Sequence, residues 1–172
     1  MPEFQRPTGL NHVAYVTCDT AATRTFYTEM LGMNLVGSAE DEKVGSTGEA
    51  GRFLHTFFQL GDGSCVAFFE IEGVEKDHHE SQLPRWAPHL ALSVGSREEL
   101  DSAHKRLTDN GVEVVGVVEH EGIWSSIYFF DPNGVRLELT FQGRQLSDDD
   151  AAHAASSVDA WIAGHPEAEV AG

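Results

Sequence analysis

Two histidines and one glutamate, far apart in the sequence, are of the residue types that bind a divalent metal ion. His12 and His89 each stand at the start of an apolar run, and Glu138 lies within the apolar run VRLEL. An ionised carboxylate is costly to bury unless it is paired or binds a metal. Two imidazoles and one carboxylate that converge leave open coordination positions and suit non-haem Fe(II). The three residues therefore predict a metal site, with Fe2+ as the expected ion and Mn2+ as a close alternative.

The alternation of side chains along a strand decides which of these residues can share one face. If Glu138 points to one face of a sheet, its neighbours Leu137 and Leu139 fill the opposite face, which is the core. We expect the face of Glu138 to be the one that His12 and His89 also use. The three metal ligands would then converge on a concave surface.

Glu70 is a further carboxylate that could reach this site. When the two predicted hairpins are aligned on their turn glycines, Ala67 takes the place of Glu138. Glu70 lies three positions beyond Ala67, and this odd offset directs it to the other face unless a bulge intervenes. We expect Glu70 to be a solvated charge at a strand end, and its entry into the site stays open.

The elements that must position these residues occur twice in the chain. Residues 11–16 and 88–94 read as strands that open with His, and helical patterns follow at 19–31 and 96–110. Ser96 is a suitable N-cap, and a glycine ends each helical pattern. A strand and then a hairpin with a GDG or a PNG turn complete each half. The order of elements is therefore βαβββ, twice.

This repeat predicts an α+β fold in which two βαβββ modules form a curved mixed sheet around a metal-binding cavity. We place the first module at residues 8–72 and the second at residues 86–142. The remaining residues, 143–172, are acidic and rich in Ala, and we expect a helix at 151–162 within them.

Composition and charge exclude several classes of protein. The chain has 172 residues and a net charge of −17, which argues against binding to nucleic acid or to anionic membranes. No apolar run approaches the ~18 residues that a membrane span needs. The N-terminus lacks the pattern of a secretory signal. We expect a cytoplasmic protein with Cys18 and Cys65 reduced.

The βαβββ repeat together with His12, His89 and Glu138 resembles the vicinal oxygen chelate superfamily. This superfamily includes glyoxalase I, fosfomycin and bleomycin resistance proteins, and type I extradiol ring-cleavage dioxygenases. The resemblance covers about residues 8–142, and it implies the fold and the three metal ligands named above. Members often pair their modules within or between chains, so a homodimer is expected.

The stretch from Val118 to Glu138, VEHEGIWSSIYFFDPNGVRLE, resembles the signature of the extradiol dioxygenases more narrowly. His120 is followed after six residues by Ile-Tyr, and then by a DPNG turn and Glu138. The resemblance implies that His120 and Tyr128 are catalytic and hydrogen-bond the oxygens of the substrate. It also implies that Glu138 binds the metal.

Two positions depart from the patterns of the family. Extradiol dioxygenases usually have a histidine where Ser64 stands here, so the acid–base residue is not identified. His55, His78 or His79 could replace it from elsewhere in the chain. Glyoxalase I has a fourth metal ligand, a Glu, at the place of Ala67, which makes that activity less favoured.

These residues favour a dioxygenase that cleaves a catechol-like aromatic diol with dioxygen. One alternative is a glyoxalase- or epimerase-like isomerase or lyase that acts through an enediolate and uses Zn2+ or Ni2+. A second is a metal-free resistance protein that sequesters its ligand. The aromatic candidates for the lining of the cavity are Phe57, Phe68, Trp124 and Phe129, and for each of them ordinary core packing is the favoured alternative.

Overall fold

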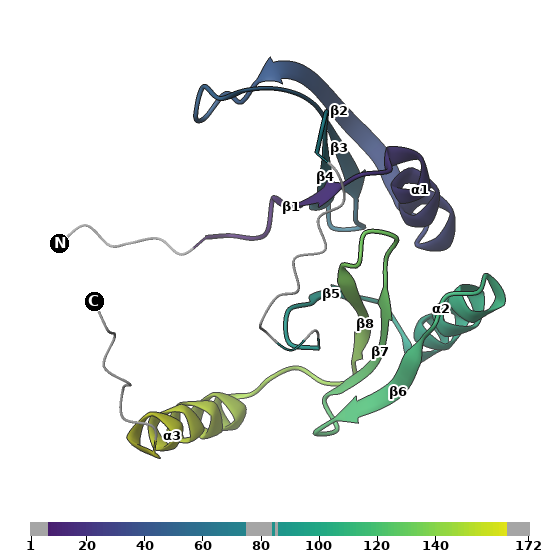
Figure 1. Cartoon of the computed structure of the whole chain (residues 1–172). Helices are drawn as coiled ribbons and strands as arrows, with labels where there is room; N and C mark the ends of the chain where they lie inside the picture. Colours follow the sequence, from purple (N-terminus) through teal and green to yellow (C-terminus); the bar gives the residue numbers. More distant parts are fainter. Residues whose placement is uncertain (1–6, 75–83, 85, 165–172) are drawn as a thin grey trace.

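The computed structural model describes residues 7–74, 84 and 86–164, and it contains the βαβββ unit twice (Figure 1). The elements of the first module are β1 (His12–Thr17), α1 (Thr20–Thr25), the π-helical turn η1 (Phe26–Met30), β2 (Asn34–Lys43), β3 (Ala50–Gln59) and β4 (Cys65–Ile71). Those of the second are β5 (Leu90–Ser93), α2 (Arg97–Asp109), β6 (Val115–His120), β7 (Trp124–Phe130) and β8 (Arg136–Gln142). Helix α3 (Asp148–Gly164) follows.

Each module forms its own four-stranded mixed sheet. The strand orders are β1-β4-β3-β2 and β5-β8-β7-β6, so the two sheets have the same topology. The first strand of each module pairs in parallel with the last, and the other pairs are antiparallel. The α+β fold with two βαβββ modules is therefore confirmed. Within this chain β1 and β5 are not hydrogen-bonded neighbours, so the sheets stay separate.

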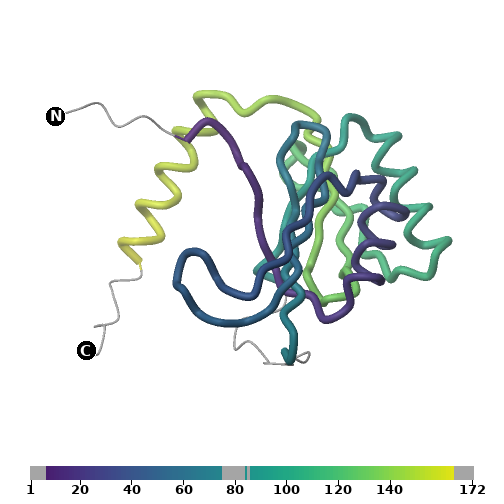
Figure 2. Tube along the Cα trace, turned by 90° about the horizontal axis from the view of Figure 1, so that it is seen from above, coloured from purple at the N-terminus to yellow at the C-terminus, as the bar shows by residue number. Residues whose placement is uncertain are grey.

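The helices lie on two opposite sides of the sheets. Helices α1 and α2 lie together on one side of the sheets, and α3 lies on the other side (Figures 1 and 2). Helix α3 buries none of its side chains and extends the predicted 151–162 at both ends. No helix among the described residues has the length and apolar character that a membrane span requires.

Local sequence explains the ends of the helices. The Ser96 hydroxyl accepts a hydrogen bond from the Glu99 amide at 3.1 Å, and the Glu99 carboxylate accepts one from the Gly95 amide at 2.7 Å. This reciprocal pair satisfies amides that the first turn of α2 leaves free. Asp19 caps α1 in a similar way through the Ala22 amide. The residues predicted to stop each helical pattern, Gly32 and Gly111, have positive φ angles, as helix-ending glycines do.

The helix-facing sides of both sheets form one hydrophobic core. Val66 on β4 and Leu137 on β8 are fully buried there, together with Leu100 and Leu107 of α2. Side chains alternate along these strands, so the residues next to each core position point to the opposite, open side of the sheet.

Two of the aromatic candidates for the lining of the cavity belong to the hydrophobic core instead. Phe68 and Phe129 belong to the buried core and are 0% and 2% exposed. Each lies one position from a residue of the open face, Ala67 or Tyr128, and therefore points to the helices.

A buried polar contact ties the two modules together. The Asp131 carboxylate, 5% exposed, accepts hydrogen bonds from the amides of Asn133 and Val135 at 2.9 and 2.8 Å. The hydroxyl of Tyr27, a fully buried residue of η1, donates to the same carboxylate at 3.2 Å. The Asn133 side-chain amide also donates to the Thr23 hydroxyl at 3.1 Å. The β7–β8 turn is thereby fixed against the first helix.

Replacing Tyr27 by Phe removes a hydrogen-bond donor to the Asp131 carboxylate and leaves the aromatic packing in place. Among the described residues, Tyr27 is the only residue of the first module whose side chain donates to this carboxylate. We expect the free energy of unfolding to fall by about 1–3 kcal/mol, because a buried acceptor loses a partner. Urea denaturation measures the change. Tyr15→Phe is the matched control, since no hydrogen bond of that hydroxyl is found among the described residues. An equal loss in both variants would contradict the account.

Candidate metal centre

His89 and Glu138 meet on the open face of the second sheet. Glu138 lies on β8, which pairs in parallel with β5, and His89 immediately precedes β5. The Nε2 atom of His89 lies 2.9 Å from Oε2 of Glu138. The Glu138 residue is 7% exposed, while about a third of the His89 side chain reaches solvent (32%). The structure thus brings together two of the three residues predicted to bind metal.

A second contact of His89 determines which ring nitrogen carries hydrogen. Its Nδ1 atom lies 2.9 Å from the carbonyl oxygen of Ala87. A carbonyl can only accept, so Nδ1 must be the donor in this bond. In the neutral ring, Nε2 then presents its lone pair to the Glu138 carboxylate, which also only accepts. The contact therefore needs either a proton on one of the two groups or a metal ion bound by both.

The geometry fits a divalent metal ion. Bonds of about 2.1 Å from a metal to nitrogen and to oxygen, at a right angle, place the two ligand atoms about 3 Å apart. The separation between His89 Nε2 and Glu138 Oε2 is 2.9 Å. A backbone carbonyl on the other ring nitrogen is the usual partner of a metal-binding histidine. His89 and Glu138 could therefore hold such an ion with little movement.

His120 and Tyr128, the residues predicted to be catalytic, form a hydrogen-bonded pair beside Glu138. His120 Nε2 lies 2.8 Å from the Tyr128 hydroxyl oxygen. Tyr128 is the direct cross-strand neighbour of Glu138. Burial raises the pKa of Tyr128, and the Glu138 carboxylate raises it further. The Tyr128 hydroxyl consequently keeps its proton near neutral pH.

Arg136 is a residue of this site that the sequence reasoning missed. Its guanidinium lies 4.3 Å from the centre of the Tyr128 ring, a cation–π contact, and it also donates a hydrogen bond to the carbonyl of Trp86. Arg136 lies two positions before Glu138, so strand alternation places both on one face. This even spacing from Glu138 is the feature of the sequence that could have identified Arg136.

These side chains surround an open cavity of about 470 Å³ on the second sheet. Trp124 lines it, as expected from the sequence, together with Thr140 and Ala91. His120, Tyr128 and Glu138 contribute the polar groups of its wall. The cavity therefore combines a carboxylate, a hydroxyl and an imidazole with an aromatic surface.

His12 occupies the corresponding place on the first sheet but does not join the other two ligands. It is exposed at the start of β1, the edge strand of that sheet. Its Nδ1 atom lies 2.7 Å from Oδ1 of Asn11, an acceptor, so Nε2 is again the nitrogen left to bind metal. Within the part of the chain that the structure describes, no group of three or more His, Cys, Asp or Glu is placed to hold one metal ion.

His55 lies on the same face of the first sheet as His12. The centres of the two rings are 6.2 Å apart. Burial lowers the pKa of His55, and the neighbouring His12 lowers it further, so the ring is neutral near pH 7. Phe57, another residue expected to line the cavity, contacts the His12 ring edge-on with the centres 5.5 Å apart.

Glu70 and Ser64 have structural partners. The Glu70 carboxylate accepts a hydrogen bond from the Thr20 amide at 2.8 Å and thereby supports the start of α1. Ser64 donates from its hydroxyl to Asp62 at 2.6 Å, within the β3–β4 turn. Glu70 is thus neither at the metal centre nor simply a solvated charge. His78 and His79 lie outside the described residues.

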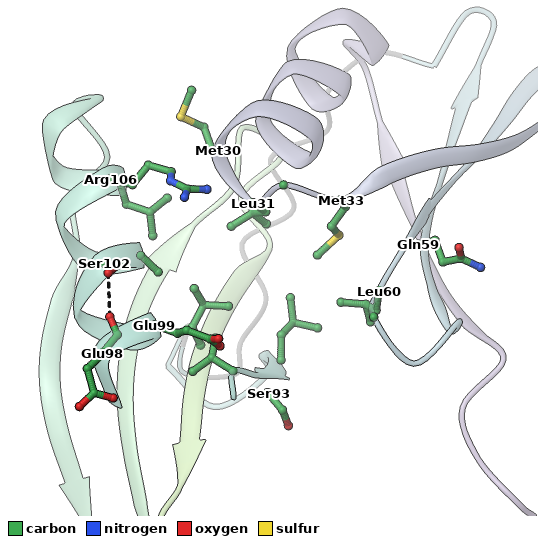
Figure 3. A pocket seen from close by; sticks show the side chains of 17 residues that line it. Met30, Leu31, Met33, Gln59, Leu60, Ser93, Glu98, Glu99, Ser102 and Arg106 are labelled. Atoms are coloured by element: carbon green, nitrogen blue, oxygen red, sulfur yellow. Dashed lines mark hydrogen bonds between the residues drawn. The ribbon is translucent and has the colours of Figure 1, made fainter. Parts of the chain in front are cut away.

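A further hollow lies on the helix side of the molecule, between the modules (Figure 3). Leu31, Met33 and Leu60 reach it from the first module, and Glu99 and Arg106 reach it from α2. Its lining includes none of the five predicted site residues. The predicted site residues lie on the open faces of the sheets instead.

Comparison with known proteins identifies the family. The model of the Glyoxalase/Bleomycin resistance protein/Dioxygenase superfamily matches residues 9–139. The metallothiol transferase FosB of Bacillus licheniformis is 31% identical over 132 residues, which cover 76% of this chain and 73% of that protein. The 2,2',3-trihydroxybiphenyl dioxygenase of Sphingomonas paucimobilis is 26% identical over 156 residues, which cover 84% of this chain and 45% of that enzyme.

A solved structure shows the same fold. A point mutant of the fosfomycin resistance protein FosX from Listeria monocytogenes, complexed with Mn(II) and 1S,2S-dihydroxypropylphosphonic acid, superposes with a TM-score of 0.57. The match has 23% identity and covers 84% of this chain and 98% of that chain. The family match spans most of the sequence and agrees with the observed fold. The chain belongs to the glyoxalase/bleomycin resistance protein/dioxygenase superfamily.

Proposed function

We propose that this protein is a metal-dependent enzyme whose divalent ion is bound by His89, Glu138 and His12. The observation that carries the proposal is the contact of 2.9 Å between His89 Nε2 and Glu138 Oε2, because two ligands of one divalent ion bound at a right angle have this separation. The Ala87 carbonyl fixes the required tautomer of His89. Fe2+ remains the expected ion, with Mn2+, Zn2+ and Ni2+ as alternatives, and the Mn(II) of the FosX complex supports a divalent ion in this fold.

We infer that His12 reaches the metal from a second copy of the chain. His12 and His89 are equivalent in the repeat, and both keep Nδ1 occupied and Nε2 available. Yet His12 does not join His89 and Glu138 within the described chain. It lies on β1, and β1 and β5 are both edge strands with one side unpaired by any strand of the described chain. If β1 of one copy pairs with β5 of another, two-fold symmetry creates two identical sites per dimer.

The preferred reaction is the cleavage of a catechol-like aromatic diol by dioxygen. A bound divalent metal would act as a Lewis acid and lower the pKa of the two adjacent substrate oxygens. The Tyr128 hydroxyl keeps a proton at Oη, where it can donate a hydrogen bond to a substrate oxygen. His120 Nε2, 2.8 Å away, orients this hydroxyl and can exchange a proton with it. The 26% sequence identity between this chain and the trihydroxybiphenyl dioxygenase also supports this reaction.

A second candidate is the transfer of a thiol to fosfomycin. The 31% identity with a metallothiol transferase, over 73% of that protein, favours it. None of the residues that line the cavity is Lys or Arg, but Arg136 lies beside Tyr128 on the same face. A phosphonate usually binds cationic partners, and the proposed divalent ion would itself be one. The choice between the two reactions therefore depends on the experiment below.

The metal site is tested by metal content and thermal stability. Wild-type protein reconstituted with Mn(II) or Fe(II) under anaerobic conditions should retain the ion after desalting, and chelation with EDTA should lower its Tm because a ligand of the folded state is removed. Glu138→Gln keeps the size of the side chain but should reduce metal affinity by about tenfold or more. His153→Ala, an exposed histidine of α3, is the matched control. Equal metal retention in wild type and Glu138→Gln would refute the site.

Oxygen consumption distinguishes the two reactions. The Fe(II) protein, given a panel of catechols, should take up dioxygen and form the yellow ring-cleavage product. Tyr128→Phe should lower kcat by about 10²–10⁴-fold, since a positioned proton donor is lost, while the metal content stays unchanged. Thiol-dependent loss of fosfomycin, without dioxygen uptake on any catechol, would establish the second candidate instead.

A further inference from the structure

A wall of aromatic rings extends from His12 across the open face of the first sheet. On β3 the residues of this face are Phe53, His55 and Phe57, and on β4 the aromatic one is Phe69. His55 is the direct cross-strand neighbour of Phe69. All of these rings lie on the side of the sheet that carries His12, opposite the side that packs on the helices.

His55 lies between two phenyl rings. Its ring stacks on Phe69 with the centres 3.6 Å apart and the planes inclined by 27°, and it lies 4.2 Å from Phe57 with the planes inclined by 35°. Phe53 contacts Phe69 edge-on at 5.4 Å, which continues the wall. The rings are only partly buried, so their open side is available to a flat partner.

The His55 ring has a polar atom without a partner. Its Nε2 atom is buried and makes no hydrogen bond among the described residues. A phenylalanine at this place would stack between Phe57 and Phe69 without leaving a buried polar atom unpaired. Buried polar groups in folded proteins are almost always satisfied, so each exception calls for a role. A small shift of the ring on binding would give Nε2 a partner from a ligand.

The residues around this wall suit a flat aromatic ligand. Small side chains, Ala14 and Ala67, lie beside Phe57 on the same face, where Ala14 is exposed and Ala67 is fully buried. The strand residues named on this face include no Lys or Arg, and neither does the lining of the cavity on the second sheet. Arg136 beside Tyr128 is the cationic side chain near these surfaces among the residues named, and aromatic rings are available for stacking on both.

We propose that this wall binds the aromatic body of the substrate, and that Phe57 and His55 determine specificity for a planar ring. The inference rests on the proposed function, in which His12 of one copy completes the metal site of another. The wall then faces the cavity that contains Trp124, and the substrate ring lies between the two aromatic surfaces. His55 contacts a polar substituent of that ring through Nε2.

The test uses 4-nitrocatechol as a chromophoric probe on the Mn(II)-loaded protein, with binding followed by absorbance. Phe57→Leu should raise the Kd of the probe about fivefold or more through the loss of ring stacking. His55→Phe retains the stacked ring and should raise the Kd by a similar factor, while its Tm equals or exceeds that of wild type. Phe141→Leu, on the helix-facing side of the second sheet, is the matched control and should leave the Kd unchanged.

The possible outcomes separate this inference from the proposed function. If wild type and variants retain Mn(II) but both first-sheet variants bind 4-nitrocatechol within twofold of wild type, the aromatic wall is not a substrate surface. If wild type retains no Mn(II), the proposed function fails and the inference fails with it. If Phe57→Leu does not fold, His55→Phe alone decides. Displacement of the probe by equimolar fosfomycin would also overturn the preference for a planar ligand.

Discussion

The account depends on the close contact between the His89 ring and the Glu138 carboxylate. The Ala87 carbonyl occupies Nδ1 of His89 and leaves the Nε2 lone pair directed at the Glu138 carboxylate, 2.9 Å away. A proton or a metal ion must lie between the two groups, and their separation is the one that two ligands of a divalent ion would have. The rest of the second module holds the pair in place: the parallel pairing of β5 with β8 sets the two residues side by side, and Leu137 and Leu139 anchor the strand in the core.

The repeat divides the chemistry between two sheets of equal topology. The second sheet supplies His89, Glu138 and the hydrogen-bonded pair of His120 and Tyr128. The first sheet supplies His12 and an aromatic face. The contact between η1 and the β7–β8 turn ties the modules together on the helix side. The edge strands β1 and β5 each have one side that no strand of the described chain pairs with, and the proposed dimer uses these two sides.

Much of the fold and part of the site could be predicted from the sequence, because strand alternation and turn glycines are local signals. They predicted the βαβββ repeat, and they predicted that Glu138 lies on the face opposite the core. The same alternation would have placed Phe68 and Phe129 in the core and added Arg136 to the site. The relative position of the sheets could not be predicted in this way, because an edge strand can pair within a chain or between chains with the same sequence. The sequence therefore predicted one converging set of three ligands, whereas the described chain brings together two. The unpaired Nε2 of His55 likewise became evident only in three dimensions.

Metal stoichiometry in a mixture of two defective variants tests the central claim, a single ion held by His89 and Glu138 of one copy and His12 of another. His12→Ala and Glu138→Gln should each bind little metal alone. After subunit exchange in a 1:1 mixture, half of the dimers carry one intact site, so about one quarter of the wild-type metal content should return. No recovery after demonstrated exchange, or full metal binding by His12→Ala alone, would contradict the account.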